Sequence, residues 1–140
     1  EGEGVSRVSN WFFGVALSSA LCSGACGILD ADPGYREYQV LADSISVPES
    51  VSVAEPLPIR IFATLGFGCH RVSHFQVQRT GRGVTLVAWG REDTGKGLVC
   101  PDSSVIMDET YLVSPPLQSP FQVTYDQPDG TILRETVTIG

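Results

Sequence analysis

After residue 42, apolar and polar side chains alternate with a period of two, which is the period of a β-strand rather than of a helix. In the segment 43–53, isoleucine and valine alternate with four serines. Pro48 interrupts this segment, and because proline has no N–H to donate to a ladder, it predicts an edge strand or a strand that switches sheets. The alternation returns in six later segments, which are 57–66, 72–79, 84–90, 104–113, 121–125 and 131–139. The pattern therefore predicts about seven strands.

Turn residues separate these predicted strands. Thr80-Gly81-Arg82-Gly83 predicts a hairpin connection in which glycine supplies a positive φ. Pro128-Asp129-Gly130 predicts a second tight turn, before the last strand. Short strands at this spacing predict an all-β domain over 43–140, and its length fits a two-sheet antiparallel sandwich better than a barrel.

The stretch from Trp11 to Leu29 has a different pattern. It contains no charged residue, its first half is bulky and apolar, and small residues dominate its second half. This order predicts an N-terminal hydrophobic signal helix followed by a cleavage region. Arg7 is the only cation before it, and Glu1 and Glu3 depart from the positive start of a strong signal. Its length also approaches that of a membrane span, so an uncleaved anchor and a buried helix of the fold remain alternatives.

The sequence Ser23-Gly24-Ala25-Cys26 resembles the bacterial lipobox, in which small residues precede a cysteine that is lipidated and becomes the new N-terminus. Gly24 and Ala25 fit that motif, whereas Ser23 occupies the place at which the family prefers leucine. The resemblance implies a diacyl anchor on Cys26, which would hold the domain at a membrane without a spanning helix. An ordinary signal cleavage that uses Ser23 and Ala25 as the small pair is the alternative.

The composition limits what the chain can bind. Hydrophobic residues make up 42% of the chain, which is enough for a core and argues against global disorder. The formal net charge is −7, and the 9 basic residues are dispersed among 16 acidic ones. Nucleic acid and electrostatic docking on anionic lipid both require a positive field, so the charge argues against both. The ordinary role of such a charge is solubility.

Four cysteines set the expected redox chemistry, and they are Cys22, Cys26, Cys69 and Cys100. If Cys22 leaves with the signal and Cys26 carries lipid, one pair remains. An exported chain meets an oxidising compartment, so we expect Cys69 and Cys100 to form a disulfide. Two free thiols would fit only a cytosolic protein.

Three parts of the chain carry a resemblance at the level of pattern. They are SISVPESVSVAEPLPIRI, GCHRVSHFQVQRTGRGVTLVAWGRE with a later second cysteine, and VTYDQPDGTILRETVTI. Together they resemble the small immunoglobulin-like β-sandwich domains of bacterial exported lipoproteins, over Ser44 to Gly140. The resemblance implies a seven-strand sandwich on the cell envelope and no established activity. Trp89 lies midway between the two cysteines rather than at core spacing after the first, so we expect the disulfide to differ from the inter-sheet bond of antibodies.

Cys69, His70 and His74 offer the side chains of a metal site or of a catalytic dyad. On one strand His70 and His74 would share a face, but their separation of about 13 Å is too large for two ligands of one ion. Cys69 would point away from His70, so the thiol also lacks a neighbouring base. We therefore expect no metal site and no nucleophile here, and we place both histidines on the solvent side of the strand.

These predictions divide the chain into a signal and lipobox-like region over 1–26, a polar tether over 27–42 and the sandwich over 43–140. They favour a non-catalytic, exported domain of the bacterial cell envelope that needs no cofactor and acts by contact with a protein or a glycan. Its membrane contact would run through the lipid anchor or the signal segment.

Two other functions remain open. The chain could be a structural accessory subunit of an envelope complex that pairs through an edge strand, in which case we expect an apolar patch near Phe62, Val87 and Trp89. Alternatively, it could be a metal-dependent hydrolase that uses His70 or His74.

Overall fold

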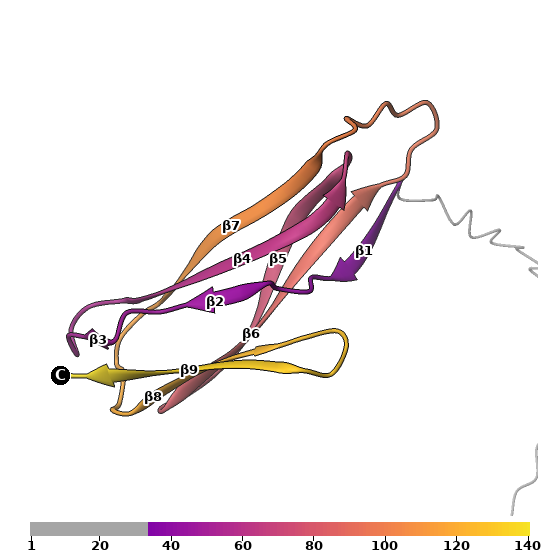
Figure 1. Cartoon of the computed structure of the whole chain (residues 1–140). Coiled ribbons are helices and arrows are strands. Elements are labelled where there is room, and N and C mark those ends of the chain that lie inside the picture. Colours follow the sequence, from indigo (N-terminus) through magenta and orange to yellow (C-terminus); the bar gives the residue numbers. More distant parts are fainter. Residues whose placement is uncertain (1–33) are drawn as a thin grey trace, which may run out of the picture. The chain divides into compact units, whose positions relative to one another are not determined.

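The computed structural model describes residues 34–140, a range in which the chain forms nine β-strands and no helix (Figure 1). The strands are β1 (Tyr35–Gln39), β2 (Ser44–Ser46), β3 (Ser50–Val51), β4 (Leu57–Phe67), β5 (His70–Thr80), β6 (Gly83–Asp93), β7 (Ser104–Val113), β8 (Phe121–Asp126) and β9 (Ile132–Ile139). The all-β prediction is confirmed. The signal helix, Cys26 and the start of the tether lie outside the described residues and stay predictions. Within 34–140, no helix is long and apolar enough to cross a membrane.

Two sheets enclose one core. The six-stranded sheet has the order β1-β6-β8-β9-β3, with β5 also paired to β6, and the three-stranded sheet has the order β2-β4-β7. Figure 1 shows β2, β4 and β7 running together, apart from the β8–β9 hairpin. Both sheets contribute to a single buried cluster, for example Ile59 and Met107 from one sheet and Leu86 and Phe121 from the other. The predicted two-sheet arrangement is thus present, with nine strands in place of about seven.

Two of the seven strand pairings are parallel, namely β6 with β8 and β3 with β9. The prediction of a purely antiparallel fold is wrong at these two pairings. Strands β3 and β8 both follow a strand of the other sheet, so each enters the six-stranded sheet from a crossing rather than from a hairpin. A hairpin forces antiparallel pairing, whereas a crossing does not.

The chain changes sheets directly after β1, and two side chains hold this crossing in place. The hydroxyl of Tyr125 donates to the carbonyl of Val40 at 2.8 Å. The amide of Gln127 accepts from the N–H of Ala42 at 2.9 Å and donates to its carbonyl at 2.8 Å. Val40 and Ala42 are buried, so these bonds satisfy backbone groups that water does not reach. The predicted tether therefore does not extend over 35–42, which belongs to the folded domain.

Pro48 marks the second change of sheet. β2 lies in the three-stranded sheet and β3 in the six-stranded sheet, with Pro48 between them. The ring of proline cannot continue a ladder, and here the ladder indeed ends and the chain leaves for the other layer. The prediction of a strand that switches sheets at Pro48 is confirmed.

The β5–β6 hairpin forms where it was predicted, but its glycines serve another purpose. Thr80 pairs with Gly83 across the turn, and neither Gly81 nor Gly83 has a positive φ. A Cβ on Gly83 would lie 2.9 Å from the carbonyl oxygen of Gln122 in β8. The close approach of the neighbouring strand, rather than the turn, therefore requires glycine at this position.

A disulfide joins Cys69 to Cys100 with their Cα atoms 5.1 Å apart, as predicted. Cys69 lies in the turn between β4 and β5, and Cys100 lies in the loop between β6 and β7, so the bond links two loops. Gly68 in the same turn has a φ of +74°, and a Cβ there would lie 2.5 Å from the Cβ of Cys100. Glycine thus provides both the backbone conformation and the space that the bond needs.

The outer face of the three-stranded sheet carries an ion pair that we expect to shift an acid titration. Nε of Arg60 donates to Asp108 at 2.6 Å, and a second guanidinium nitrogen also donates to this carboxylate. The hydrogen bonds from Arg60, and then its charge, lower the pKa of Asp108 below the ordinary value. The pair therefore stabilises the fold at pH values above the ordinary aspartate pKa, and this small contribution disappears as pH falls through the lowered pKa.

We predict that Arg60→Gln raises the titration midpoint of Asp108 toward the ordinary aspartate range, as followed by NMR of the side-chain carboxyl. Asp129 is the internal control, because hydrogen bonds from Thr131 rather than from Arg60 lower its pKa. An unchanged midpoint at Asp108 in the variant would contradict the assignment of the shift to Arg60.

Candidate functional site

The outer face of the six-stranded sheet presents a row of polar side chains, and the alternation of β6 decides which of them reach solvent. Leu86 and Ala88 are buried, whereas Thr85 and Trp89 point to the outer side and stay partly exposed. The sequence alone does not decide which side of this strand faces the core, because both sides carry apolar residues. The neighbouring strands β5 and β8 present glutamine and threonine on the same side, so this part of the face is polar except at Val87 and Trp89 of β6.

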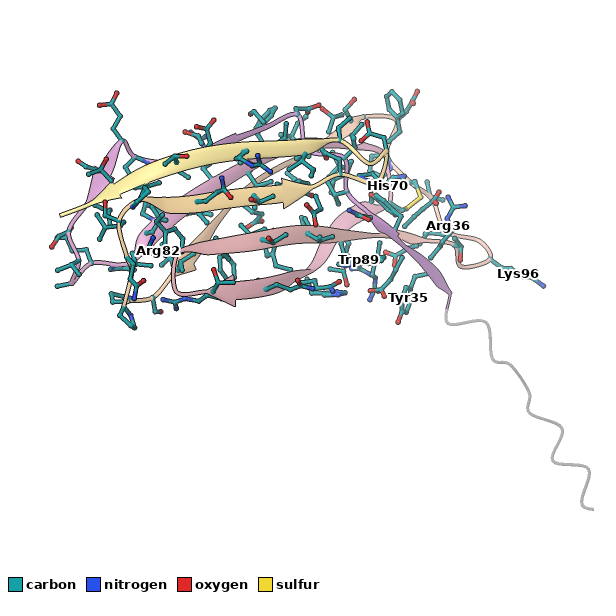
Figure 2. All side chains as sticks on the ribbon, turned by 90° about the horizontal axis from the view of Figure 1, so that it is seen from below. Tyr35, Arg36, His70, Arg82, Trp89 and Lys96 are labelled. Atoms are coloured by element: carbon teal, nitrogen blue, oxygen red, sulfur yellow. A yellow bond between two sulfur atoms is a disulfide. The ribbon has the colours of Figure 1, made fainter. Side chains whose placement is uncertain are left out.

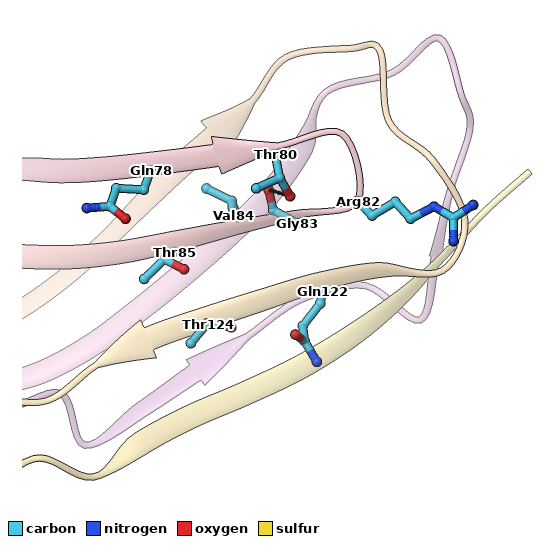
Figure 3. A pocket seen from close by; sticks show the side chains of 8 residues that line it. All are labelled: Gln78, Thr80, Arg82, Gly83, Val84, Thr85, Gln122 and Thr124. Atoms are coloured by element: carbon cyan, nitrogen blue, oxygen red, sulfur yellow. Dashed lines mark hydrogen bonds between the residues drawn. The ribbon is translucent and has the colours of Figure 1, made fainter.

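A groove of about 360 Å³ lies at the end of this face near the β5–β6 turn (Figure 3). Three strands supply the amide and hydroxyl side chains that line it, namely Gln78 and Thr80 from β5, Thr85 from β6, and Gln122 and Thr124 from β8. Arg82 adds the charged side chain of the groove. Amides and hydroxyls both donate and accept hydrogen bonds, so the groove can bind a ligand that is rich in hydroxyl groups.

Trp89 lies further along β6 on the same outer face, about 13 Å from Thr85 by strand rise. Its ring stacks on His74 with the centroids 6.0 Å apart and the planes 7° apart. The indole N–H donates to the side-chain oxygen of Gln76 at 3.3 Å. These two contacts fix the orientation of a partly exposed aromatic ring, which can offer apolar area to a ligand beside the polar groove.

The structure separates the two histidines that lie close together in the sequence. A register shift between Val72 and His74 places a β-bulge at Ser73 in β5. The extra residue reverses which side chains point inward, so His70 and His74 no longer share a face. The side chain of His70 is 17% exposed and that of His74 is 53% exposed. The prediction that both histidines lie on the solvent side is therefore wrong for His70.

His70 belongs to a compact polar cluster beneath β1. The hydroxyl oxygen of Tyr38 lies 2.8 Å from Nδ1 of His70, and a carboxylate oxygen of Glu92 lies 3.9 Å from Nε2. Burial, followed by the negative charge of Glu92, raises the pKa of Tyr38, so the phenol stays protonated at neutral pH. Gly90 leaves room for this ring, because a Cβ there would lie 2.6 Å from it. The cluster therefore packs β1 against β5 and β6.

Cys69, His70 and His74 do not converge on one point. The sulfur of Cys69 is bonded to Cys100, His70 points inward, and His74 stacks on Trp89. Among residues 34–140, no group of three or more His, Cys, Asp or Glu side chains could hold a metal ion. Cys26, the predicted lipid attachment site, lies outside the described residues.

The apolar patch expected near Phe62, Val87 and Trp89 does not form as one surface. Phe62 lies on the outer side of the three-stranded sheet, while Val87 and Trp89 lie on the outer side of the six-stranded sheet. Phe62 instead shares its face with the exposed side chains of Ile106 and Leu112 on β7. The structure thus separates a polar outer face from a more apolar one.

Sequence reasoning did not find the groove, although it identified the strands that build it. The groove exists because β8 lies in parallel beside Gly83–Leu86 of β6, and alternation within one strand does not reveal its neighbour. The available signal was the set of outward-facing amide and hydroxyl residues in 72–80, 84–90 and 121–125, which resembles an ordinary solvent face.

Comparison of the chain with known protein families, with curated proteins and with solved structures found no match. The candidate site therefore rests on its geometry.

Proposed function

We propose that the chain is a non-catalytic, exported domain of the bacterial cell envelope that is anchored by lipid on Cys26 and acts by contact with a glycan. Its two sheets are proposed to be a variant of the immunoglobulin-like sandwich, with two added short strands. The disulfide supports this proposal, because such bonds persist in oxidising compartments outside the cytoplasm.

The observation that carries the glycan proposal is the groove, which lies on the same outer face as Trp89. Sugar hydroxyls donate and accept hydrogen bonds, and the amides and hydroxyls of Gln78, Gln122 and Thr124 match both roles. The fixed ring of Trp89 on the same face can cover the less polar side of a sugar ring. An elongated glycan that follows β6 from the groove toward Trp89 would use both features.

We predict that soluble glycan strands released from bacterial cell wall shift the NMR signals of the groove and of the Trp89 indole in the full chain. Thr124→Val together with Gln122→Ala should weaken binding about tenfold or more, since each lost hydrogen bond contributes roughly 1 kcal/mol. Thr110→Val is the matched control, because Thr110 lies on the outer side of the other sheet and should leave affinity unchanged.

Equal losses in the groove variant and in Thr110→Val would contradict binding at the groove. An absence of shifts with any cell-wall glycan would contradict the glycan proposal as a whole. Neither outcome bears on the anchor, which a different measurement tests.

A second candidate function is edge pairing with a larger envelope protein, and one observation favours it. In the described part of the chain, β7 pairs only with β4, so the other edge of this 10-residue strand is open. Open edges accept a further strand, and the exposed Ile106 and Leu112 beside this edge would add apolar contact. An envelope protein that co-purifies with the native chain, but not with Ile106→Lys, would favour this function over glycan binding.

A further inference from the structure

Three large apolar side chains are exposed at one end of the domain, and we call them the apolar tip. They are Phe67, which is 67% exposed at the end of β4, and Leu98 and Val99, which are 48% and 91% exposed in the loop between β6 and β7. Exposed apolar groups gathered at one site mark a contact surface more often than single exposed residues do.

The fold holds the two parts of the tip together. The disulfide from Cys69 to Cys100 ties the turn after Phe67 to the loop that carries Leu98 and Val99. The N–H of Gly68 also donates to the carbonyl of Ser103 at 3.0 Å. The tip is therefore a constrained surface rather than two independent loops.

The tip lies at the end of the domain where β1 begins. The N–H of Thr94, at the start of the loop, donates to the carbonyl of Gly34 at 2.8 Å. Figure 2 shows Tyr35, Arg36 and Lys96 at this end and Arg82 at the opposite end. Strand β6 connects the two ends through 11 residues, which is roughly 36 Å.

The length of chain before β1 determines which end can face a membrane. Between Cys26 and the described domain lie residues 27–33, and the segment 27–34 spans at most about 28 Å when fully extended. This reach is shorter than β6, so an anchor on Cys26 excludes an upright domain whose Gly34 end points away from the bilayer. In the upright orientation that remains, the tip is the part of the domain closest to lipid.

Two acidic side chains near the tip lie in ion pairs. Glu92 pairs with Arg36, and Asp93 pairs with Arg71 and Arg91 at 2.8 and 3.2 Å. These two carboxylates are thus neutralised locally, while Asp102 is exposed in the tip loop and the chain as a whole carries a net charge of −7. Exposed Lys96 adds a cation in the same loop, and lysine and aromatic residues are typical of membrane interfaces.

From these observations we propose that Phe67, Leu98 and Val99 insert into the interfacial layer of the bilayer and fix the orientation of the domain. This inference rests on the proposed lipid anchor at Cys26. Its consequence is that the groove and Trp89, which lie along the side of the domain, are held at a defined height above the lipid surface.

The experiment uses the full lipidated chain in liposomes of phosphatidylethanolamine and phosphatidylglycerol with brominated acyl chains, which quench nearby tryptophan. Val99→Trp places a probe in the tip. Gln118→Trp is the matched control at the far end, because Gln118 lies beside the β5–β6 turn, 3.5 Å from a Cβ built on Gly81. Trp89 contributes the same background to both variants. We expect Val99→Trp to lose most of its added fluorescence and Gln118→Trp to lose none.

The possible failures are distinguishable. If the chain floats with the liposomes but Val99→Trp is not quenched, the tip proposal is overturned while the anchor stands. If the chain does not float with them, the anchor fails and the tip contact fails with it. If the emission of Val99→Trp moves to the blue only after envelope proteins are added, without quenching by brominated lipid, the tip contacts a protein and the lipid proposal is overturned.

Discussion

Replacing both Cys69 and Cys100 with alanine is expected to lower the free energy of unfolding by roughly 3–4 kcal/mol. The bond closes a loop with a sequence separation of 31 residues, and opening that loop gives the unfolded chain conformational freedom that the bond removes. The loss is a large fraction of the stability of a small domain. Chemical denaturation of the oxidised protein and of the double variant measures it directly.

Reduction provides the control for this prediction. Treating the unmodified protein with a thiol reductant should bring its stability to that of the double variant, and the same treatment should leave the double variant unchanged. A loss below about 1 kcal/mol would contradict the expected role, because it would mean that closing this loop contributes little to the free energy of unfolding.

Gln127→Met is expected to lower the free energy of unfolding by about 2–4 kcal/mol, which is the second largest effect we predict. Methionine has a similar length but removes both hydrogen bonds to Ala42. The N–H and the carbonyl of Ala42 would then be buried without partners, and each such group costs about 1–3 kcal/mol. Denaturant unfolding followed by tryptophan fluorescence or circular dichroism measures the change.

Gln122→Met is the matched control, because Gln122 lies on β8, the strand that directly precedes Gln127, and its side chain is exposed. This variant should change stability by no more than about 0.5 kcal/mol. Equal effects of the two substitutions would show that Gln127 does not hold the crossing between the sheets.

Local pattern was sufficient to predict most strands but not their partners. Period-two alternation located seven strand segments, and Pro48 indicated the change of sheet that the structure shows. The segment 35–42 was missed because its alternation is weak and its stability depends on Tyr125 and Gln127, which are distant in the sequence. The parallel pairing of β6 with β8 was missed because it also joins segments that are distant in the sequence.

In the candidate site, too, the features that depend on nearby residues were predictable, and those that depend on distant strands were not. Cysteine parity predicted the disulfide correctly, because it depends only on counting and on the expected compartment. The inward position of His70 was not predictable, since one extra residue at Ser73 reverses the facing of the strand and leaves no clear mark in the sequence. The groove depends on three strands at once, so no single segment could reveal it.

The proposed function requires a domain that is exported and anchored by lipid, and one measurement tests this requirement most directly. Intact-mass analysis of the chain, purified from the membrane fraction of its native cells, reports processing, lipid attachment and the disulfide together. We predict a chain that begins at Cys26, carries acyl groups and has lost two hydrogen atoms through the Cys69–Cys100 bond. A chain that retains residues before Cys26, has no lipid and contains free thiols at both positions would contradict the account.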